Sequence, residues 1–170
     1  MARVSTKDHK NIYFRLRDEL GLSREKASEL LESIPPERIE RIENEKTLPH
    51  PDEILVMAEK YKAPHLCNYY CANECPIGQQ YVPEIEIKDL SQIVLEMLAS
   101  LNAIHKKQER LIEITVDGNI EKDEVEDFVG IQEDLEKISI TVETLQLWVE
   151  QMLANGKIDI DAYNKYKENH

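Results

Sequence analysis

Three cysteines stand four residues apart in the stretch HLCNYYCANECPIG. On a helix, Cys67 and Cys71 would share one face, and Cys75 would come where Pro76 ends the helix. The three thiolates could hold zinc, with His65 as a fourth ligand, or an iron–sulfur cluster that another subunit or an open site completes. The alternatives are three small buried apolar side chains or a redox-sensing thiol pair. The spacing marks candidate metal ligands but makes no cofactor certain.

Calcium binding and catalysis have little support in the sequence. The stretch EITVDGNIEKDE has Gly118, Ile120 and Glu124 at positions of a calcium loop, but its first half offers only Glu113 and Asp117 as carboxylates. We therefore expect no calcium site. The five histidines are scattered, and the sequence has neither a glycine-rich phosphate loop nor a nucleophile beside an obvious base. We expect no enzyme activity.

The other candidate residues gather in SIPPERIERIENEKTLP, residues 33–49, where three basic side chains stand among four glutamates. Pro35 and Pro36 suit the first turn of a helix, and Ile39 and Ile42 supply its buried face. Basic side chains on such a helix could contact DNA, whereas the glutamates would repel it. The helix is therefore either a DNA-reading helix or an acidic amphipathic one.

Proline, glycine and capping residues predict five short helices before residue 76. The first runs from about Asp8 to Leu20 and stops at Gly21, the second from Ser23 to Leu31, the third follows Pro35, the fourth runs from Pro51 to Tyr61, and the fifth from Pro64 to the stop at Pro76–Gly78. The following stretch, PIGQQYVPEIEIKD, has no helical periodicity. We therefore predict one domain over residues 1–78, a linker over 79–87 and a second domain over 88–170.

The second domain carries two long apolar rows whose members alternate four and three apart, as the side-by-side packing of long helices requires. The first row is Leu90, Val94, Met97, Leu101, Ile104, Gln108 and Leu111, and the second is Phe128, Ile131, Leu135, Ile138, Val142, Leu145, Val149 and Met152. Asp117 and Gly118 form a turn between them, which predicts an antiparallel, coiled-coil-like hairpin. A last short helix is expected near Ile160–Lys167.

Further apolar residues widen each stripe beyond what one neighbouring helix can cover: Ile93, Leu98, Ile112, Val129, Ile140 and Trp148. A second copy of the chain is the simplest cover. We therefore expect residues 88–153 to form a homodimer, a four-helix bundle built from two hairpins. The alternative is that the stripe packs on the first domain.

The first domain also carries a set of residues in a recognisable order: Arg17, Gly21-Leu22-Ser23, Ala27-Ser28, Ile39, Ile42-Glu43-Asn44, Pro49, Leu55 and Ala58. Over about residues 10–66, this set resembles the phage-repressor-like (Cro-like, XRE) helix-turn-helix family. The resemblance implies an all-α fold in which a five-helix, lambda-repressor-like domain precedes the hairpin. It also implies an ion pair between Arg17 and Glu43 that joins the first helix to the third.

The resemblance further implies which residues would touch DNA. Four match slots that contact phosphates, which position a protein without selecting a sequence: Arg24, Asn44, Lys46 and Thr47. Four match exposed slots that enter the major groove: Pro36, Glu37, Arg38 and Arg41. Arg41 is the strongest candidate, because a guanidinium can bind guanine O6 and N7 together. Glu37 could accept from a cytosine amino group.

Three features depart from the family pattern, and one of them is Ser28, which stands where alanine usually packs. The turn LESIPP, with Glu32 and Ser33, is one residue longer than usual, so the angle between the second and third helices could differ. Glu45 stands where the family has a glycine, and it places an acid where the DNA backbone often passes.

The net charge of −13 is unevenly distributed. Residues 1–80 hold 12 Lys and Arg against 14 Asp and Glu, whereas residues 81–170 hold 9 against 20. The acidic second half argues against nucleic acid there, but the nearly neutral first half leaves DNA binding open. The chain begins without the apolar run of a signal peptide and has no run of about 20 apolar residues, so we expect a cytoplasmic protein that does not enter a membrane.

These observations predict a dimeric, sequence-specific transcription regulator whose partner is double-stranded DNA. The alternative function belongs to another class: a helix-turn-helix-derived protein-interaction or DNA-mimic regulator, which would bind a protein instead of DNA. Enrichment of a preferred sequence from a DNA pool would discriminate between the two.

Overall fold

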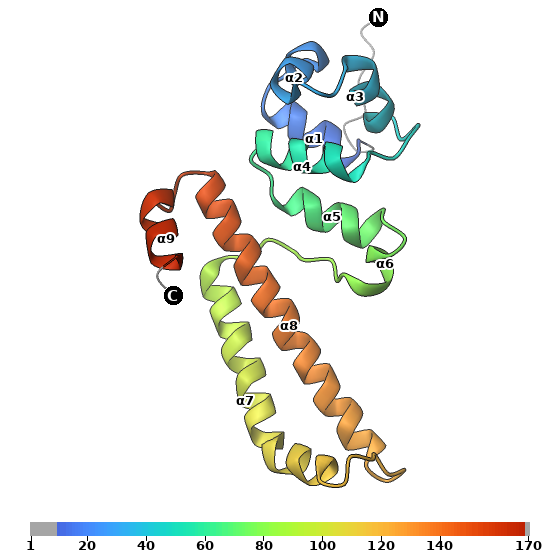
Figure 1. Cartoon of the computed structure of the whole chain (residues 1–170), viewed down its shortest axis with the longest axis vertical. Coiled ribbons are helices and arrows are strands. Elements are labelled where there is room, and N and C mark those ends of the chain that lie inside the picture. The colour runs from blue at the N-terminus through green and yellow to red at the C-terminus, as the bar shows by residue number, and fades with distance from the viewer. Residues whose placement is uncertain (1–9, 169–170) are drawn as a thin grey trace, which may run out of the picture. The chain divides into compact units, whose positions relative to one another are not determined.

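The computed structural model describes residues 10–168, and every regular element in that range is a helix (Figure 1). The chain divides into two compact units, one with residues up to Glu84 and from Gln151 onward, the other with Ile85–Glu150. The first division falls inside the predicted linker, whereas the residues after 150 group with the first unit and not with the hairpin. No helix in the described range is long and apolar enough to cross a membrane.

The first unit contains α1 to α6 and α9. Their bounds are α1 Ile12–Glu19, α2 Arg24–Leu31, α3 Pro36–Glu43, α4 Pro51–Lys60, α5 His65–Asn73, α6 Gly78–Tyr81 and α9 Ile160–Lys167. The five helices predicted before residue 76 and the last short helix are therefore confirmed. The single turn of α6 was not predicted, because it follows a proline stop and is too short to show periodicity.

Local capping explains where the first helices begin and end. α1 starts at Ile12, later than predicted, because the Asn11 side chain accepts a backbone N–H of the first turn and caps the helix there. The predicted start, Asp8, lies outside the described residues. Gly21 adopts a φ of 65°, the left-handed conformation that commonly follows a helix end, and Ser23 caps α2 as predicted.

The connection from α2 to α3 accommodates the extra residue in a tight turn. Glu32 has φ 58° and ψ −42°, and the N–H of Ser33 donates to the Leu31 carbonyl at 2.6 Å. This geometry is a γ-turn, which is strained for a residue with a side chain. The turn lets Ile34 enter the core, where it is 1% exposed, and α2 and α3 remain packed together.

One apolar core holds the first unit together. Its buried members are Tyr13, Ala27, Leu31, Ile34, Ile39, Ile42, Ile54, Met57, Ala58, Tyr61, Ala63 and Leu66. The two isoleucines expected to bury one side of the third helix, Ile39 and Ile42, are among them. Burying a large aliphatic side chain stabilises a fold by about 1.5 to 3 kcal/mol, so these two residues fix which side of α3 remains outside.

The second unit is a hairpin built from α7 (Leu90–Thr115) and from α8 (Val125–Ala154) as far as Glu150. The two helices run antiparallel and pack together (Figure 1). The turn contains the predicted pair: Gly118 has a φ of 75°, and the Asp117 carboxylate accepts the N–H of Asn119 at 3.0 Å. The all-helical fold class is therefore confirmed in both units.

The contact between α7 and α8 matches the predicted rows only in part. Ile131 of the second row is 1% exposed, but on α7 the most buried residues, Ile93 and Ile114, lie outside the first row. Leu101 and Val142 of the predicted rows are 48% and 40% exposed. The predicted rows are therefore wrong in part. Each helix is rotated about its own axis relative to the prediction, so that residues beside the predicted row face the other helix.

Polar contacts explain this rotation. The Lys107 ammonium group of α7 lies 2.7 Å from Asp134 Oδ2 and donates to the Gly130 carbonyl at 3.0 Å. Thr141 and Thr144 are also buried and donate to carbonyls of their own helix. A heptad pattern predicts how often along each helix a residue faces the other helix. It does not predict which polar side chains pair across the contact.

An apolar row is consequently left exposed on each helix. On α7 it comprises Leu90, Val94, Leu98, Leu101 and Ile112, and on α8 it comprises Leu135 and Val142 with the half-buried Phe128 and Val149. At 3.6 residues per turn, each row lies roughly 100° around its helix from the contact between the helices. Viewed from the N-terminus of each helix, the rotation from the contact to the row has the same direction in both. Because the helices are antiparallel, both rows fall on the same side of the hairpin. We call this side the exposed apolar face.

Candidate nucleic-acid interface

A buried ion pair holds α3 in place against α1. The Arg17 guanidinium binds both carboxylate oxygens of Glu43, whose side chain is 1% exposed, and also donates to the Leu22 carbonyl. The hydrogen bond with Glu43 raises the pKa of Arg17. The predicted Arg17–Glu43 pair is confirmed, and Glu43 has a structural role.

Arg24, at the start of α2, joins the same cluster. Its Nε donates to Glu43 Oε2 at 2.8 Å, and its Nη1 lies 3.9 Å from Glu40 Oε1. The side chain nevertheless remains 32% exposed. A residue proposed to contact phosphate is therefore anchored at its Nε while part of the guanidinium faces outward.

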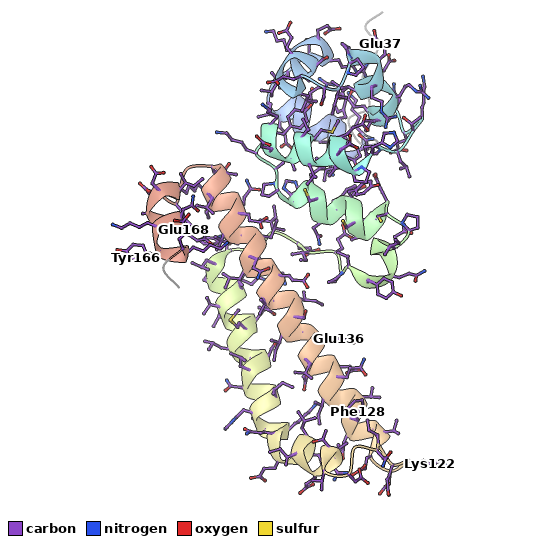
Figure 2. All side chains as sticks on the ribbon, in the orientation of Figure 1. Glu37, Lys122, Phe128, Glu136, Tyr166 and Glu168 are labelled. Atoms are coloured by element: carbon purple, nitrogen blue, oxygen red, sulfur yellow. The ribbon has the colours of Figure 1, made fainter. Side chains whose placement is uncertain are left out.

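The outward face of α3 lies opposite Ile39 and Ile42 and consists of Glu37, Glu40, Arg41 and Asn44. These four residues stand three or four apart, so they share one side of the helix, and all four are exposed. Figure 2 shows Glu37 at the outer edge of this domain.

Arg41 and Asn44 differ in their partners on this face. Asn44 reaches Glu40 Oε1 at 3.5 Å, at the limit of a hydrogen bond. Among the residues that the structure describes, none forms a hydrogen bond or ion pair with the Arg41 side chain. Arg41 therefore presents an available guanidinium on the outward face.

Arg38 does not belong to the outward face, contrary to the sequence-based expectation that it would enter the major groove. Its Nε and Nη2 donate to the two carboxylate oxygens of Glu53 at 2.7 and 2.6 Å. The remaining donors reach Thr47 Oγ1 at 2.7 Å and the Leu48 carbonyl at 2.9 Å. We correct this assignment: Arg38 joins α3 to the start of α4 and to the loop between them.

Glu53 was missed by the sequence analysis. It stands three residues after His50, and its carboxylate also accepts the His50 N–H at 2.7 Å, so it caps α4 as well as pairing with Arg38. An acid at the third position of a helix that opens with proline is a capping signal that the sequence does contain. Its second partner, Arg38, is 15 residues away and could not be inferred from local pattern.

The other candidate residues lie at the two ends of α3. Pro36 occupies the first turn and is half-buried, and Lys46 is exposed just beyond the helix. Thr47 is half-buried because its hydroxyl accepts from Arg38. Glu45, at the family's glycine position, adopts a φ of 56°, so the backbone keeps the left-handed conformation that glycine would favour.

The cysteine stretch lies on α5 and just after it, as predicted. Cys67, Cys71 and Cys75 are all half-buried, and Cys67 packs against the core. Within residues 10–168, no three His, Cys, Asp or Glu side chains are arranged to hold one metal ion. His65 is half-buried as well, and burial lowers its pKa. The metal, redox and packing interpretations of the cysteines therefore stay predictions, and the proposed function uses no metal.

The comparison with protein families agrees with this geometry. Residues 15–65 match the family model described as "Helix-turn-helix". The match begins inside α1 and ends at the first residue of α5, so it contains the Arg17–Glu43 pair and the outward face of α3. No curated protein and no solved structure matches the chain. Residues 15–65 therefore form a helix-turn-helix domain, as their resemblance to the phage-repressor-like family predicted.

Proposed function

We propose that this protein is a sequence-specific DNA-binding transcription regulator that acts as a dimer in the cytoplasm. The observation that carries the proposal is the outward face of α3, on which Arg41 is exposed and has no partner among the described residues. Two buried isoleucines and the Arg17–Glu43 pair fix the opposite side of the helix. The guanidinium is thus presented at a fixed orientation, as direct readout of base edges requires.

Arg41 and Glu37 are the proposed sequence-selecting residues. Arg41 can donate to O6 and N7 of guanine, a pairing that discriminates by about 1 to 3 kcal/mol against other bases. Glu37 can accept from the amino group of cytosine. Pro36 would make an apolar contact at the beginning of the helix. Arg38 is omitted because its donors are occupied by Glu53, Thr47 and Leu48.

Contacts with the DNA backbone would come from residues around the ends of α2 and α3. Lys46 is exposed after α3, Asn44 is exposed at its last turn, and Arg24 is partly exposed at the start of α2. Thr47 is less accessible, and we expect it to contribute mainly through its backbone N–H. Such contacts set affinity and its salt dependence more than sequence preference.

The proposal is tested by selecting preferred duplexes from a random DNA pool at low salt and measuring affinity by fluorescence anisotropy. Arg41→Ala should relax the preference at one base pair and cost about 1 to 3 kcal/mol on the selected sequence. Lys46→Ala should weaken all sequences alike and reduce the salt slope by about one. A pool from which no sequence is enriched would contradict the proposal.

One observation favours the alternative function, binding to a protein. Glu37 and Glu40 are exposed beside Arg41, so the outward face of α3 carries more acidic than basic groups. A basic partner would complement it better than a duplex would. Under this alternative, neither the native chain nor the Arg41→Ala variant binds DNA specifically. The two proteins would therefore have the same affinity for every duplex.

The proposed dimer rests on the exposed apolar face of the hairpin. Patches of aligned leucine and valine side chains on two adjacent helices are typical of protein interfaces. A second copy supplies an identical face, and a two-fold axis would pair the hairpins in a four-helix bundle. Two helix-turn-helix domains in one dimer would recognise two half-sites.

A further inference from the structure

A pocket of about 380 Å³ lies beside the connection from α3 to α4. Its wall is drawn from four parts of the first unit: the start of α1 with Asn11 and Tyr13, Ile42 of α3, the stretch from Glu45 to Pro49, and Tyr69 and Glu74 at α5. Its volume is in the range of small-molecule sites, which are commonly concave, largely apolar and supplied with a few polar groups. Lys46 and Thr47 are the two lining residues that the proposed function places in contact with DNA.

Two tyrosine rings form the aromatic part of the pocket. The Tyr13 and Tyr69 rings meet edge to face, with their centroids 6.3 Å apart and their planes at 80°. Ile42 and Pro49 add buried apolar surface. This lining can bury the organic body of a ligand, and the face of an aromatic ring also attracts a cation.

The charged groups of the pocket are predominantly acidic. The hydroxyl of Tyr13 donates to Glu74 Oε2 at 2.8 Å, which fixes one carboxylate at the end of α5. Glu45 contributes a second carboxylate close enough to influence the first, and among the described residues Lys46 is the one basic side chain in the lining. An anionic ligand would be repelled by this pair, whereas an ammonium group would find two carboxylates and aromatic rings together.

We infer that this pocket binds a small organic cation, an ammonium group on an aromatic or aliphatic body. The organic body would lie against Tyr69 and Ile42, and the ammonium group would lie between the Glu45 and Glu74 carboxylates.

Such a ligand would also strengthen DNA binding, and this regulatory part rests on the proposed function. The pocket shares Lys46 and Thr47 with the proposed phosphate-contacting residues. Glu45 stands directly before Lys46 and repels the same phosphates that the lysine attracts. A cation held beside Glu45 would offset this repulsion, as charges a few ångströms apart near a protein surface interact appreciably.

Ligand binding is tested on the full chain without DNA, using phenethylammonium as the probe. Nuclear magnetic resonance titration should show saturable shifts in the backbone amides from Glu45 to Leu48. Phenethyl alcohol, which is neutral, should bind at least about fivefold more weakly, because it lacks the cation–π and carboxylate interactions. Absence of saturable shifts, or equal affinity for the two probes, would overturn the inference.

Matched variants locate the site. Glu74→Gln keeps an acceptor for the Tyr13 hydroxyl but removes the charge, so it should weaken phenethylammonium binding about fivefold to tenfold. Glu45→Gln, at an exposed position, should do the same without risk to folding. Glu59→Gln removes an exposed acid of the same unit that does not line the pocket, and it should leave affinity unchanged. Equal losses in the Glu59 and Glu74 variants would indicate nonspecific attraction and overturn the assigned site.

The regulatory part is tested by anisotropy with the selected duplex at matched ionic strength. Saturating phenethylammonium should tighten DNA binding about threefold to tenfold, and Glu45→Gln should tighten it to a similar extent without ligand. Unchanged DNA affinity in both experiments would overturn the regulatory part alone. If the chain bound phenethylammonium but no DNA, the proposed function would be contradicted and the inferred ligand site would still be supported.

Discussion

Arg38 and Arg41 are three residues apart on one short helix, yet the structure gives them opposite roles. The difference comes from direction. Arg38 projects toward α4, where Glu53, Thr47 and the Leu48 carbonyl satisfy its donors. Arg41 lies on the outward face of α3 and has no hydrogen-bond or ion-pair partner among the described residues. A guanidinium that already binds a carboxylate with two donors must give up that pair before it can bind a base. Only Arg41 is available without such a cost.

The two arginines should therefore separate stability from recognition. Arg38→Ala leaves Glu53 without its main partner, and we expect the free energy of unfolding to fall by about 2 to 3 kcal/mol. Arg41→Ala should change it by no more than about 0.5 kcal/mol, since the side chain is exposed and unpaired. Urea denaturation of the two variants measures both values. Equal destabilisation by the two substitutions would contradict the assigned roles.

Two glutamates of the same unit should make stability depend on pH in opposite directions. Burial would raise the pKa of Glu53, but hydrogen bonds from Arg38 and from the His50 N–H outweigh it and lower that pKa. Burial raises the pKa of Glu74 despite the hydrogen bond from Tyr13, and the Glu45 carboxylate adds to the increase.

The sign of each effect follows from linkage. Glu53 stabilises the fold above its unfolded pKa of about 4.3, and this contribution is lost as the pH falls through its lower folded value. Glu74 is favoured in its protonated form, so its ionisation destabilises the fold as the pH rises above about 4.3. Near neutral pH, Glu53→Gln should lower the free energy of unfolding and Glu74→Gln should raise it. Urea denaturation across the acid range should show the Glu53 difference shrinking as the pH falls below about 4.3, whereas the Glu74 difference should shrink as the pH falls through its raised folded pKa and be gone below about 4.3. A pH-independent difference for either variant would contradict its assignment.

At the scale of helices, one glycine determines how α6 packs on α5. A Cβ atom at Gly78 would lie 2.0 Å from the Cys71 carbonyl oxygen, which is backbone and cannot move aside as a side chain would. Gly78→Ala should therefore destabilise the first unit by about 1 to 3 kcal/mol or more. Thermal unfolding followed by circular dichroism measures the change.

Gly130, within α8, is the matched control. A Cβ there would meet only the flexible Lys107 ammonium group, at 3.4 Å. Because alanine favours a helix interior over glycine by roughly 0.5 to 1 kcal/mol, Gly130→Ala should stabilise the hairpin or leave it unchanged. Destabilisation by Gly130→Ala as large as that by Gly78→Ala would show that the close approach at Cys71 is not the cause.

The sequence predicts the helices better than it predicts the contacts between them. Helix ends depend on nearby residues such as Gly21 and Ser23, so they follow from local pattern, and the order of family residues correctly identified the Arg17–Glu43 pair. The Arg38–Glu53 pair depends on how two helices approach each other, which no spacing along the chain reveals. The rotation of α7 and α8 has the same origin, since it follows from the pairing of Lys107 with Asp134.

At the scale of the whole molecule, charge and apolar surface divide between the two halves of the chain. The hairpin region, residues 88–153, has 6 Lys and Arg against 15 Asp and Glu, yet it also carries the exposed apolar face. Association of two copies through this face would bury apolar side chains and bring like charges together. The first effect favours a dimer, and the second opposes it in a salt-dependent way.

These opposing effects predict a dimer that becomes tighter as salt is added, measured by sedimentation equilibrium across protein concentrations. Replacing both Leu101 and Val142 by Asn should raise the dissociation constant of the dimer by well over tenfold. In a two-fold symmetric dimer each residue occurs twice in the interface, so the two substitutions remove four apolar side chains from it. Leu95→Asn is the control: Leu95 is 68% exposed and lies at the edge of the exposed apolar face, roughly 100° around α7 from its middle, so its replacement should weaken the dimer far less. A native chain that remains monomeric at all concentrations, or a Leu95 variant that dissociates as readily as the double variant, would contradict this interface. Because hairpin contacts such as Lys107–Asp134 lie on another side of the helices, circular dichroism should show the double variant still fully helical.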